Sequence, residues 1–149
     1  MTLQTLATIV GILTAIASGI YILIKDLRKV QQKYRLKLQG NWTNEGDITS
    51  IGKETHYCDL QFSTDIEDGE ITGVISCRNL KKDFAVNNTS INGNLKFRSG
   101  TVRLSDVKRG ELLKYGKARI TLDGKLLRWK LLDGSTDYFP KSTTFWLNN

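Results

Sequence analysis

The first 24 residues of this chain carry no charged side chain, and the 13 residues that follow carry six Lys or Arg against one Asp. Within this opening segment, the 19 residues from Leu6 to Ile24 are apolar except for hydroxyl groups, which a helix can satisfy internally. At about 1.5 Å per residue, a helix of that length matches the ~30 Å hydrocarbon core of a bilayer. Residues 1–24 are therefore predicted to form a transmembrane helix.

Three other structures compete with a spanning helix. A cleaved signal peptide normally opens with a positive region and has a shorter apolar core, and this chain lacks that positive start. A buried helix of a soluble domain and an interfacial amphipathic helix both need a polar stripe, which is absent between Leu6 and Ile24. The spanning helix fits best, and the signal peptide is the strongest alternative.

Residues 25–37 form a basic juxtamembrane stem, predicted to continue as a short helix. Its cations are Lys25, Arg28, Lys29, Lys33, Arg35 and Lys37. No positive side chain precedes the apolar segment, so the positive-inside rule places residues 38–149 in the cytoplasm of a single-pass protein. The same cations would attract anionic lipid headgroups of the bilayer.

The apolar segment also carries a stripe of small residues. Ala7, Gly11, Ala15 and Gly19 recur every four positions and share one helix face. Small side chains let helix backbones approach closely in lipid, where the hydrophobic effect does not pull helices together. Small residues are also common in membrane helices generally. We interpret this stripe as a surface for homo-oligomerisation of the helix.

The net charge of +7 could suggest nucleic-acid binding, but the anchor carries most of it. Residues 1–37 hold six positive and one negative charge, which leaves sixteen positive and fourteen negative charges for residues 38–149. A domain with so small an excess is not expected to bind duplex nucleic acid.

The sequence offers little for catalysis. There is one histidine, His56, and the two cysteines, Cys58 and Cys77, lack the spacing of zinc ligands. No Gly-x-Ser-x-Gly elbow and no phosphate-binding P-loop occurs. We therefore expect no enzyme activity, no metal site and no cofactor. In a cytoplasmic domain both cysteines should be reduced, buried and inert, whereas the opposite orientation would permit a disulfide.

Residues 38–149 alternate between apolar and polar side chains, which is typical of strands with one buried face. Eight strands are predicted, at 40–46, 54–64, 70–78, 84–98, 101–107, 112–122, 126–132 and 138–147. Turn signals are Asp68-Gly69, Ser99-Gly100, Asp123-Gly124 and Asp133-Gly134. Eight antiparallel strands on this length indicate a small up-and-down β-barrel, whose closure removes exposed edges. Its lining should be apolar, with Trp129 and Trp146 packed inside and His56 and Asp106 as polar exceptions.

An up-and-down barrel would separate the loop charges between its two ends. The candidate ligand-binding residues gather at the basic end and are Lys53, Arg78, Lys81, Lys82, Lys108, Arg109 and Tyr115, with Lys114 nearby. The acidic end holds Asp65, Glu67, Asp68, Glu70 and Asp123, and it adjoins the stem at Gly40. Arg and Lys grip phosphates and an aromatic ring stacks on a base, so the basic rim suits a nucleotide. The alternative is that these cations are solvated loop residues without a role in binding.

Two resemblances follow from these features. Gly40-Asn41-Trp42 at the first strand resembles the Gly-x-Trp start of lipocalin and calycin barrels. The combination of membrane helix, basic stem and small barrel resembles the membrane-anchored β-barrel effectors of bacterial cyclic-nucleotide (CBASS) antiphage defence. This implies that the barrel binds a cyclic di- or oligonucleotide, and that helix oligomerisation then disrupts the bacterial inner membrane. Those effectors usually have two transmembrane helices, whereas one is found here.

Three alternative functions remain open at this point. Membrane effectors of type III CRISPR systems, which sense cyclic oligoadenylate, share the same plan. A membrane-tethered, lipocalin-like carrier or sensor of an apolar small molecule would use the barrel interior and requires an internal cavity. A simple membrane-tethered interaction module requires neither ligand.

Overall fold

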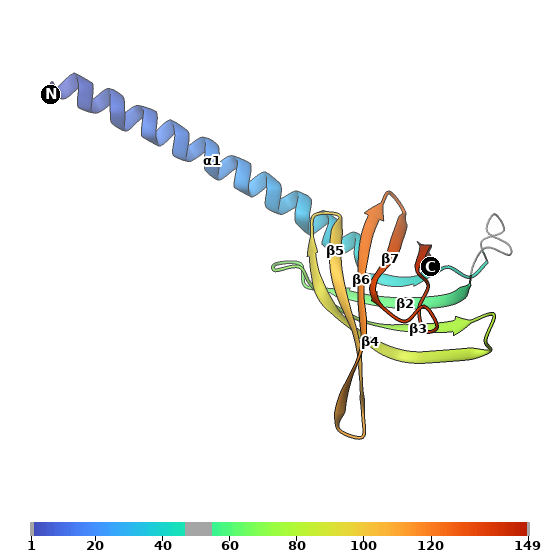
Figure 1. Cartoon of the computed structure of the whole chain (residues 1–149). Coiled ribbons are helices and arrows are strands. Elements are labelled where there is room, and N and C mark those ends of the chain that lie inside the picture. Colours follow the sequence, from blue (N-terminus) through green and yellow to red (C-terminus); the bar gives the residue numbers. More distant parts are fainter. Residues whose placement is uncertain (1, 47–54, 149) are drawn as a thin grey trace.

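The computed structural model describes residues 2–46 and 55–148, and it consists of one long helix followed by a closed barrel of eight antiparallel strands (Figure 1). Strands that follow one another in sequence pair with one another, and β1 closes the barrel by pairing with β8. The elements are α1 (Leu3–Leu38), β1 (Gly40–Thr43), β2 (His56–Thr64), β3 (Glu70–Asn79), β4 (Phe84–Lys96), β5 (Ser99–Lys108), β6 (Glu111–Asp123), β7 (Leu126–Gly134) and β8 (Ser142–Leu147). The predicted fold class is confirmed.

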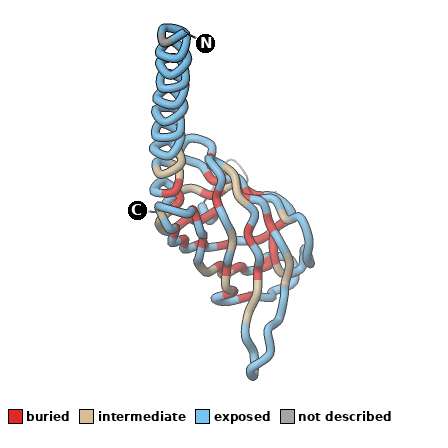
Figure 2. The backbone as a smooth tube through the Cα atoms, turned by 90° about the vertical axis from the view of Figure 1, so that its left-hand side faces the viewer, coloured by how far each residue is buried: buried red, intermediate tan, exposed pale blue. Residues whose placement is uncertain are grey.

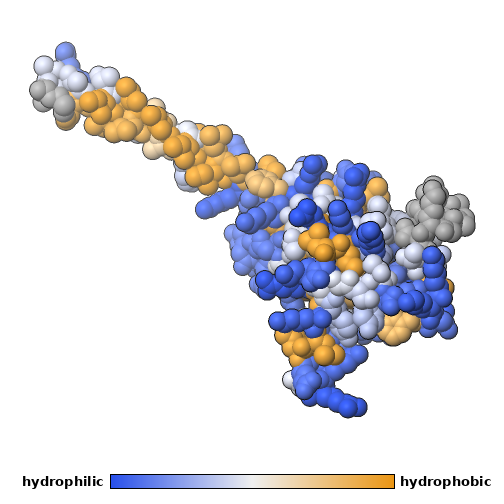
Figure 3. Space-filling view, in the orientation of Figure 1, coloured by the Kyte–Doolittle hydropathy of each residue, from blue (hydrophilic) through white to orange (hydrophobic). Residues whose placement is uncertain are grey.

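Helix α1 runs without a break from the apolar segment through the basic stem. The Thr14 hydroxyl donates to the Val10 carbonyl at 2.8 Å, and the Ser18 hydroxyl donates to the Thr14 carbonyl at 2.8 Å, so these polar groups are satisfied within the helix. Figure 2 shows α1 exposed along most of its length, and Figure 3 shows its surface to be largely hydrophobic. By length and composition, it is a candidate membrane-spanning helix.

Two predicted turns lie inside strands. Ser99 and Gly100 begin β5, and the chain turns instead at Phe97, whose φ is +54°. A Cβ on Gly100 would lie 2.5 Å from the Asn94 carbonyl oxygen, so this glycine serves close strand approach rather than a turn. Asp133-Gly134 likewise ends β7, and β8 begins at Ser142 rather than at 138.

The barrel core is filled by side chains from alternate strand positions, as expected for an eight-stranded barrel. The largest fully buried side chains include Trp129, Phe139 and Phe145. The Trp129 indole donates to the Pro140 carbonyl at 3.1 Å, so its polar atom is satisfied. Trp146 was expected inside but lies on the outer face of β8 and is half-buried, because its neighbour Phe145 takes the inward position.

The two predicted polar exceptions of the core have different positions. His56 is buried, and its ring nitrogens lie 2.8 Å from the Thr55 hydroxyl and 3.2 Å from the Asp137 carbonyl oxygen. It is a satisfied core residue. Asp106 does not line the core, because it lies on the β5–β6 hairpin and accepts a hydrogen bond from the Val107 amide.

Both ends of the barrel are closed. At the helix end, Leu38 is completely buried and its carbonyl accepts a 2.9 Å hydrogen bond from the Trp42 indole. At the far end, the segment between β7 and β8 places Phe139 in the core and stacks Tyr138 against Phe84, with ring centroids 5.3 Å apart. The core is therefore covered by the end of α1 on one side and by the aromatic side chains of the β7–β8 segment on the other.

The helix is also fastened to the barrel by a buried arginine. Arg35 is 7% exposed, and its Nη1 donates to the carbonyls of Ile66, at 2.6 Å, and of Glu67. The Gln39 side chain adds a 2.8 Å hydrogen bond to the Thr64 carbonyl. The β2–β3 loop, where most of the predicted acidic end lies, thus adjoins the stem.

The cysteines differ from the expectation of free thiols. Cys58 and Cys77 are directly opposite each other on β2 and β3, with Cα atoms 4.1 Å apart, and they form a disulfide. Both side chains point into the core and are buried. The alternation of each strand predicted the inward direction, but only the strand register places the two sulfurs together.

Candidate functional site

The predicted basic end is an ion-paired and largely sealed surface. Lys82 Nζ lies 2.8 Å from an Asp137 carboxylate oxygen, and the Asn79 amide donates to the Asp137 backbone carbonyl at 3.0 Å. Arg78 forms a 3.4 Å ion pair with Asp83. The Lys82 and Asn79 contacts join the β3–β4 turn to the segment between β7 and β8, and the two ion pairs partly neutralise the cations proposed to hold a phosphate.

Of the remaining predicted residues, Lys81 and Tyr115 also lie at this end of the barrel, whereas Lys108 and Arg109 do not. Lys81 is an exposed turn residue, and Lys53 lies outside the described residues. Lys108 and Arg109 are at the tip of the β5–β6 hairpin, which projects from the barrel on the side away from α1 (Figures 1 and 2). Tyr115 packs edge-on against Tyr138 and Phe139, with ring centroids 5.6 and 6.2 Å away.

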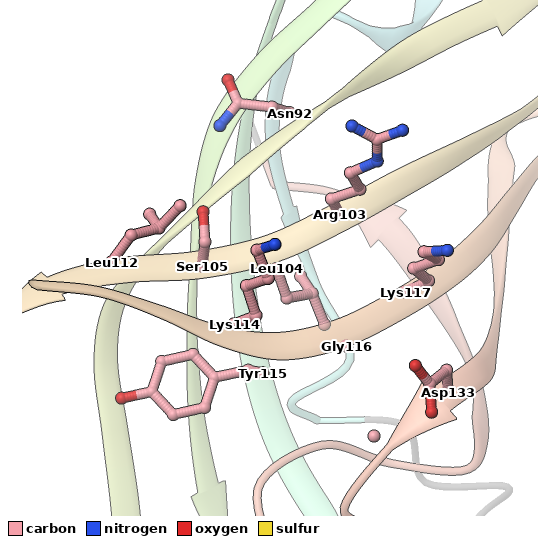
Figure 4. Close-up of a pocket in the computed structure, with 11 residues that line it drawn as sticks. Asn92, Arg103, Leu104, Ser105, Leu112, Lys114, Tyr115, Gly116, Lys117 and Asp133 are labelled. Carbon is pink, nitrogen blue, oxygen red and sulfur yellow. The ribbon is translucent and has the colours of Figure 1, made fainter.

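A cleft of about 600 Å³ opens instead on the outer wall of the barrel, at the base of that hairpin (Figure 4). Its volume lies within the range of small-molecule sites, about 300–1,000 Å³. It is lined by Asn92, Arg103, Leu104, Ser105, Leu112, Lys114, Tyr115, Gly116, Lys117, Asp133 and Gly134. Of the predicted ligand-binding residues that the structure describes, Tyr115 alone contributes to this lining.

A β-bulge brings the cleft cations together. Leu104 pairs with Gly116 and Ser105 pairs with Lys114, so Tyr115 is inserted between them without a partner in the register. The bulge lets Lys114 and Lys117, three positions apart, both point outward, which regular alternation would forbid. In Figure 4, Arg103, Lys114 and Lys117 rise from one side of β5 and β6, while the Tyr115 ring lies on the other side.

Glycine is required where β6 meets β7 at the edge of the cleft. Gly116 has a φ of +146°, and a Cβ there would lie 2.1 Å from the Asp133 carbonyl oxygen. It pairs directly with Gly134, whose φ is +120°. The two glycines allow these strands to approach more closely than side chains would permit.

The cleft has the chemistry of an anion site. Among the described residues, Arg103, Lys114 and Lys117 form no ion pair, although Asp133 is opposite Lys117 in the strand register. Asn92 and Ser105 add hydrogen-bonding groups, and Leu112 adds an apolar wall. Cations beside neutral hydrogen-bonding groups suit phosphate or carboxylate. Within the described part of the chain, no cluster of three metal-ligating side chains occurs.

Sequence reasoning missed Arg103 and Lys117 and gave Lys114 only a neighbouring place. Arg103 and Lys117 lie within paired strands, whereas the predicted residues were chosen from the loops that gather at the ends of a barrel. The sequence does contain a signal for Lys117, because the alternation of this strand places Lys117 on the outer face and its neighbour Ala118 on the inner face. The pairing of Arg103 with Lys117, however, depends on register.

The proposed oligomerisation stripe lies on an exposed face of α1. Ala7, Gly11, Ala15 and Gly19 are all exposed. A Cβ added at Gly11 or at Gly19 would meet no atom within 4 Å outside the helix's own nearby backbone. This face of α1 is therefore accessible to another helix.

No family model matches this chain, and neither a curated protein nor a solved structure matches it significantly.

Proposed function

We propose that this protein is a membrane-anchored sensor whose barrel binds a phosphate-bearing ligand of nucleotide size in the β5–β6 cleft. The observation that carries this proposal is that Arg103, Lys114 and Lys117, which form no ion pair among the described residues, line a cleft of about 600 Å³ with Asp133 as its one carboxylate. Arg provides bidentate hydrogen bonds to phosphate and Lys a mobile point charge.

A cyclic di- or oligonucleotide is the ligand class we favour. It combines several phosphates with bases that can use the hydrogen-bonding groups of Asn92 and Ser105 and the apolar wall of Leu112. The resemblance in architecture to antiphage membrane effectors, of the CBASS or the type III CRISPR kind, supports the same class. The apolar-carrier alternative is disfavoured, because Trp129, Phe139 and Phe145 occupy the barrel interior.

The response to the ligand is proposed to be assembly of α1 with α1 of other copies. A ligand shifts such an equilibrium only if it prefers the assembled form. The Arg35 and Leu38 contacts connect α1 to the barrel, so a change in barrel packing between copies would be transmitted to the helices. Assembly in the bacterial inner membrane would then disrupt that membrane.

We place the barrel in the cytoplasm, on the strength of the basic stem and the positive-inside rule. The Cys58–Cys77 disulfide argues the other way, since disulfides are rare in the cytoplasm. The redox state of the pair in cells is therefore a direct test of orientation, and a prediction for it is given below.

The ligand proposal is tested by isothermal titration of the full-length protein in zwitterionic nanodiscs against cyclic dinucleotides and cyclic oligoadenylates. Arg103→Gln with Lys117→Gln should lower the affinity more than tenfold, because each charged hydrogen bond contributes about 1.5–3 kcal/mol. The matched control, Lys81→Gln with Lys82→Gln, changes the charge equally at the originally predicted rim. If only the Lys81→Gln, Lys82→Gln variant loses nucleotide binding, the site is at the rim and not in the cleft. If none of the cyclic nucleotides binds the parent protein, the nucleotide proposal is contradicted.

The helix response is tested with Gly11→Leu combined with Ala15→Leu. A larger side chain at Gly11 meets nothing in the single chain, so the variant should fold normally. We expect it to lose ligand-dependent crosslinking between copies and membrane permeabilisation while retaining ligand affinity. Unchanged crosslinking would exclude the small-residue face as the interface.

A further inference from the structure

The outer wall of β5, β6 and β7 carries cations in successive rows. In the strand register, Arg103 is opposite Lys117, and Arg119 is opposite Lys130. Arg128 follows in the next row, opposite Thr121. All five side chains are exposed. Arg119, Arg128 and Lys130 do not line the cleft, so the basic wall extends well beyond it.

This arrangement costs the barrel stability. Like charges directly opposite each other on neighbouring strands repel, and the wall contains two such pairs, Arg103 with Lys117 and Arg119 with Lys130. Among the described residues, Arg128 is the one member of the set with an ion pair, to Asp123. The other four cations form no ion pair among the described residues, although Asp133 is opposite Lys117 in the register. A polyanionic partner would remove the repulsion.

The strands beside the cations supply neutral hydrogen-bonding groups. The row that contains Arg119 and Lys130 includes Thr101 on β5, Asn94 on β4 and Ser142 on β8, and it reaches a carboxylate only at Glu70 on β3. Rows on one face are two residues apart, about 6.6 Å along the strand. That spacing is comparable to the separation of successive phosphates in an extended nucleic-acid strand.

We infer that this wall binds single-stranded nucleic acid. The central row lacks the apolar anchors that the core of a protein–protein interface needs, whereas a phosphate backbone requires cations alone. Trp146, half-buried on the same outer face and one strand away, offers a surface on which a base can stack.

Geometry favours a flexible strand over other polyanions. The wall of a small barrel is convex, so a single strand can follow it, whereas a duplex is stiff over about 150 base pairs. Strands β5, β6 and β7 form the side of the barrel, and α1 leaves from one end (Figures 1 and 2), so a bilayer crossed by α1 would lie toward that end. The wall shares Arg103 and Lys117 with the cleft, but its central pair, Arg119 and Lys130, lies outside the cleft and can be tested separately from the cyclic-nucleotide proposal.

The test is fluorescence anisotropy of a labelled 20-nucleotide oligothymidylate, with full-length protein in nanodiscs of zwitterionic lipid. With about four phosphates neutralised, the slope of log K against log salt should be near −3, because each contributes about 0.7. Arg119→Gln with Lys130→Gln should lower the affinity at least tenfold and reduce that slope by about 1.4. The control, Lys37→Gln with Lys81→Gln, removes the same charge elsewhere and should change neither quantity.

Three outcomes would overturn the inference. They are an equal loss in the control variant, tighter binding of a duplex of the same length, and displacement by polyglutamate as effective as by unlabelled oligonucleotide. The last would identify an acidic protein as the partner. Titration of the Arg119→Gln, Lys130→Gln variant with the panel of cyclic dinucleotides and cyclic oligoadenylates separates the two proposals, because both residues lie outside the cleft and that affinity should be unchanged.

Discussion

Arg35 fastens α1 to the β2–β3 loop, and a single substitution can remove this contact. Arg35 is 7% exposed, and its guanidinium bonds to two successive carbonyls of the β2–β3 loop, those of Ile66 and Glu67. Its Nε has no hydrogen-bond partner among the described residues, and Gly69 packs against it so closely that a Cβ there would lie 2.7 Å away. Replacing Arg35 with Met keeps the aliphatic volume and removes both hydrogen bonds.

The expected cost follows from these contacts. Two hydrogen bonds from a charged donor contribute about 1.5–3 kcal/mol each, and relief of the unpaired Nε offsets part of this, so a net loss of about 3 kcal/mol is expected. For a domain of this size, that lowers the Tm by roughly 10 °C. Thermal unfolding in detergent, followed by the near-ultraviolet signal of the barrel tryptophans, measures it.

The control is Arg28→Met, which removes the same charge from an exposed position of the same helix. It should leave the Tm within about 1–2 °C of the parent, as surface substitutions usually do. Equal Tm values for the two variants would refute the reasoning, since they would mean that the buried guanidinium does not hold α1 to the loop. Arg35→Met can also be tested for ligand-dependent crosslinking of α1 between copies. If crosslinking is lost while the ligand affinity is unchanged, the contact of Arg35 with the β2–β3 loop is needed to pass the response from the barrel to the helix.

Two further predictions concern the barrel itself. Gly116→Ala should destabilise the barrel by more than ~2 kcal/mol in urea unfolding and abolish ligand binding, because the φ of Gly116 is +146° and a Cβ there would strike the Asp133 carbonyl. The control is Gly124→Ala, where φ is +63° and the space around the residue is open. It isolates the conformational cost and should retain binding. Reduction of the Cys58–Cys77 disulfide, whose sequence separation is 19, should cost about 3 kcal/mol, while Cys58→Ala with Cys77→Ala should make the Tm independent of reductant. Alkylation of both thiols in acid-quenched cells is expected for a cytoplasmic barrel, and an oxidised pair there would reverse the proposed orientation.

Much of the fold could be predicted because its signals are local. Nineteen successive residues without a charge indicate a spanning helix, and the alternation around Leu127 and Trp129 indicates a strand with one buried face. The errors arose where a local signal has two meanings. Gly100 was interpreted as a turn residue, but it serves strand approach, and Trp146 was placed in the core by its type although its position on β8 points outward.

The sequence by itself determined the membrane-compatible helix, the basic stem and the alternating strands, because hydropathy and period depend only on neighbouring residues. The tertiary structure alone decided which residues meet across strands. Register placed Cys58 opposite Cys77 and Arg119 opposite Lys130, and a single bulge at Tyr115 turned Lys114 and Lys117 to the same side. Such pairings join positions far apart in the chain, and a shift of one residue would reverse every side chain of a strand, so no local pattern specifies them.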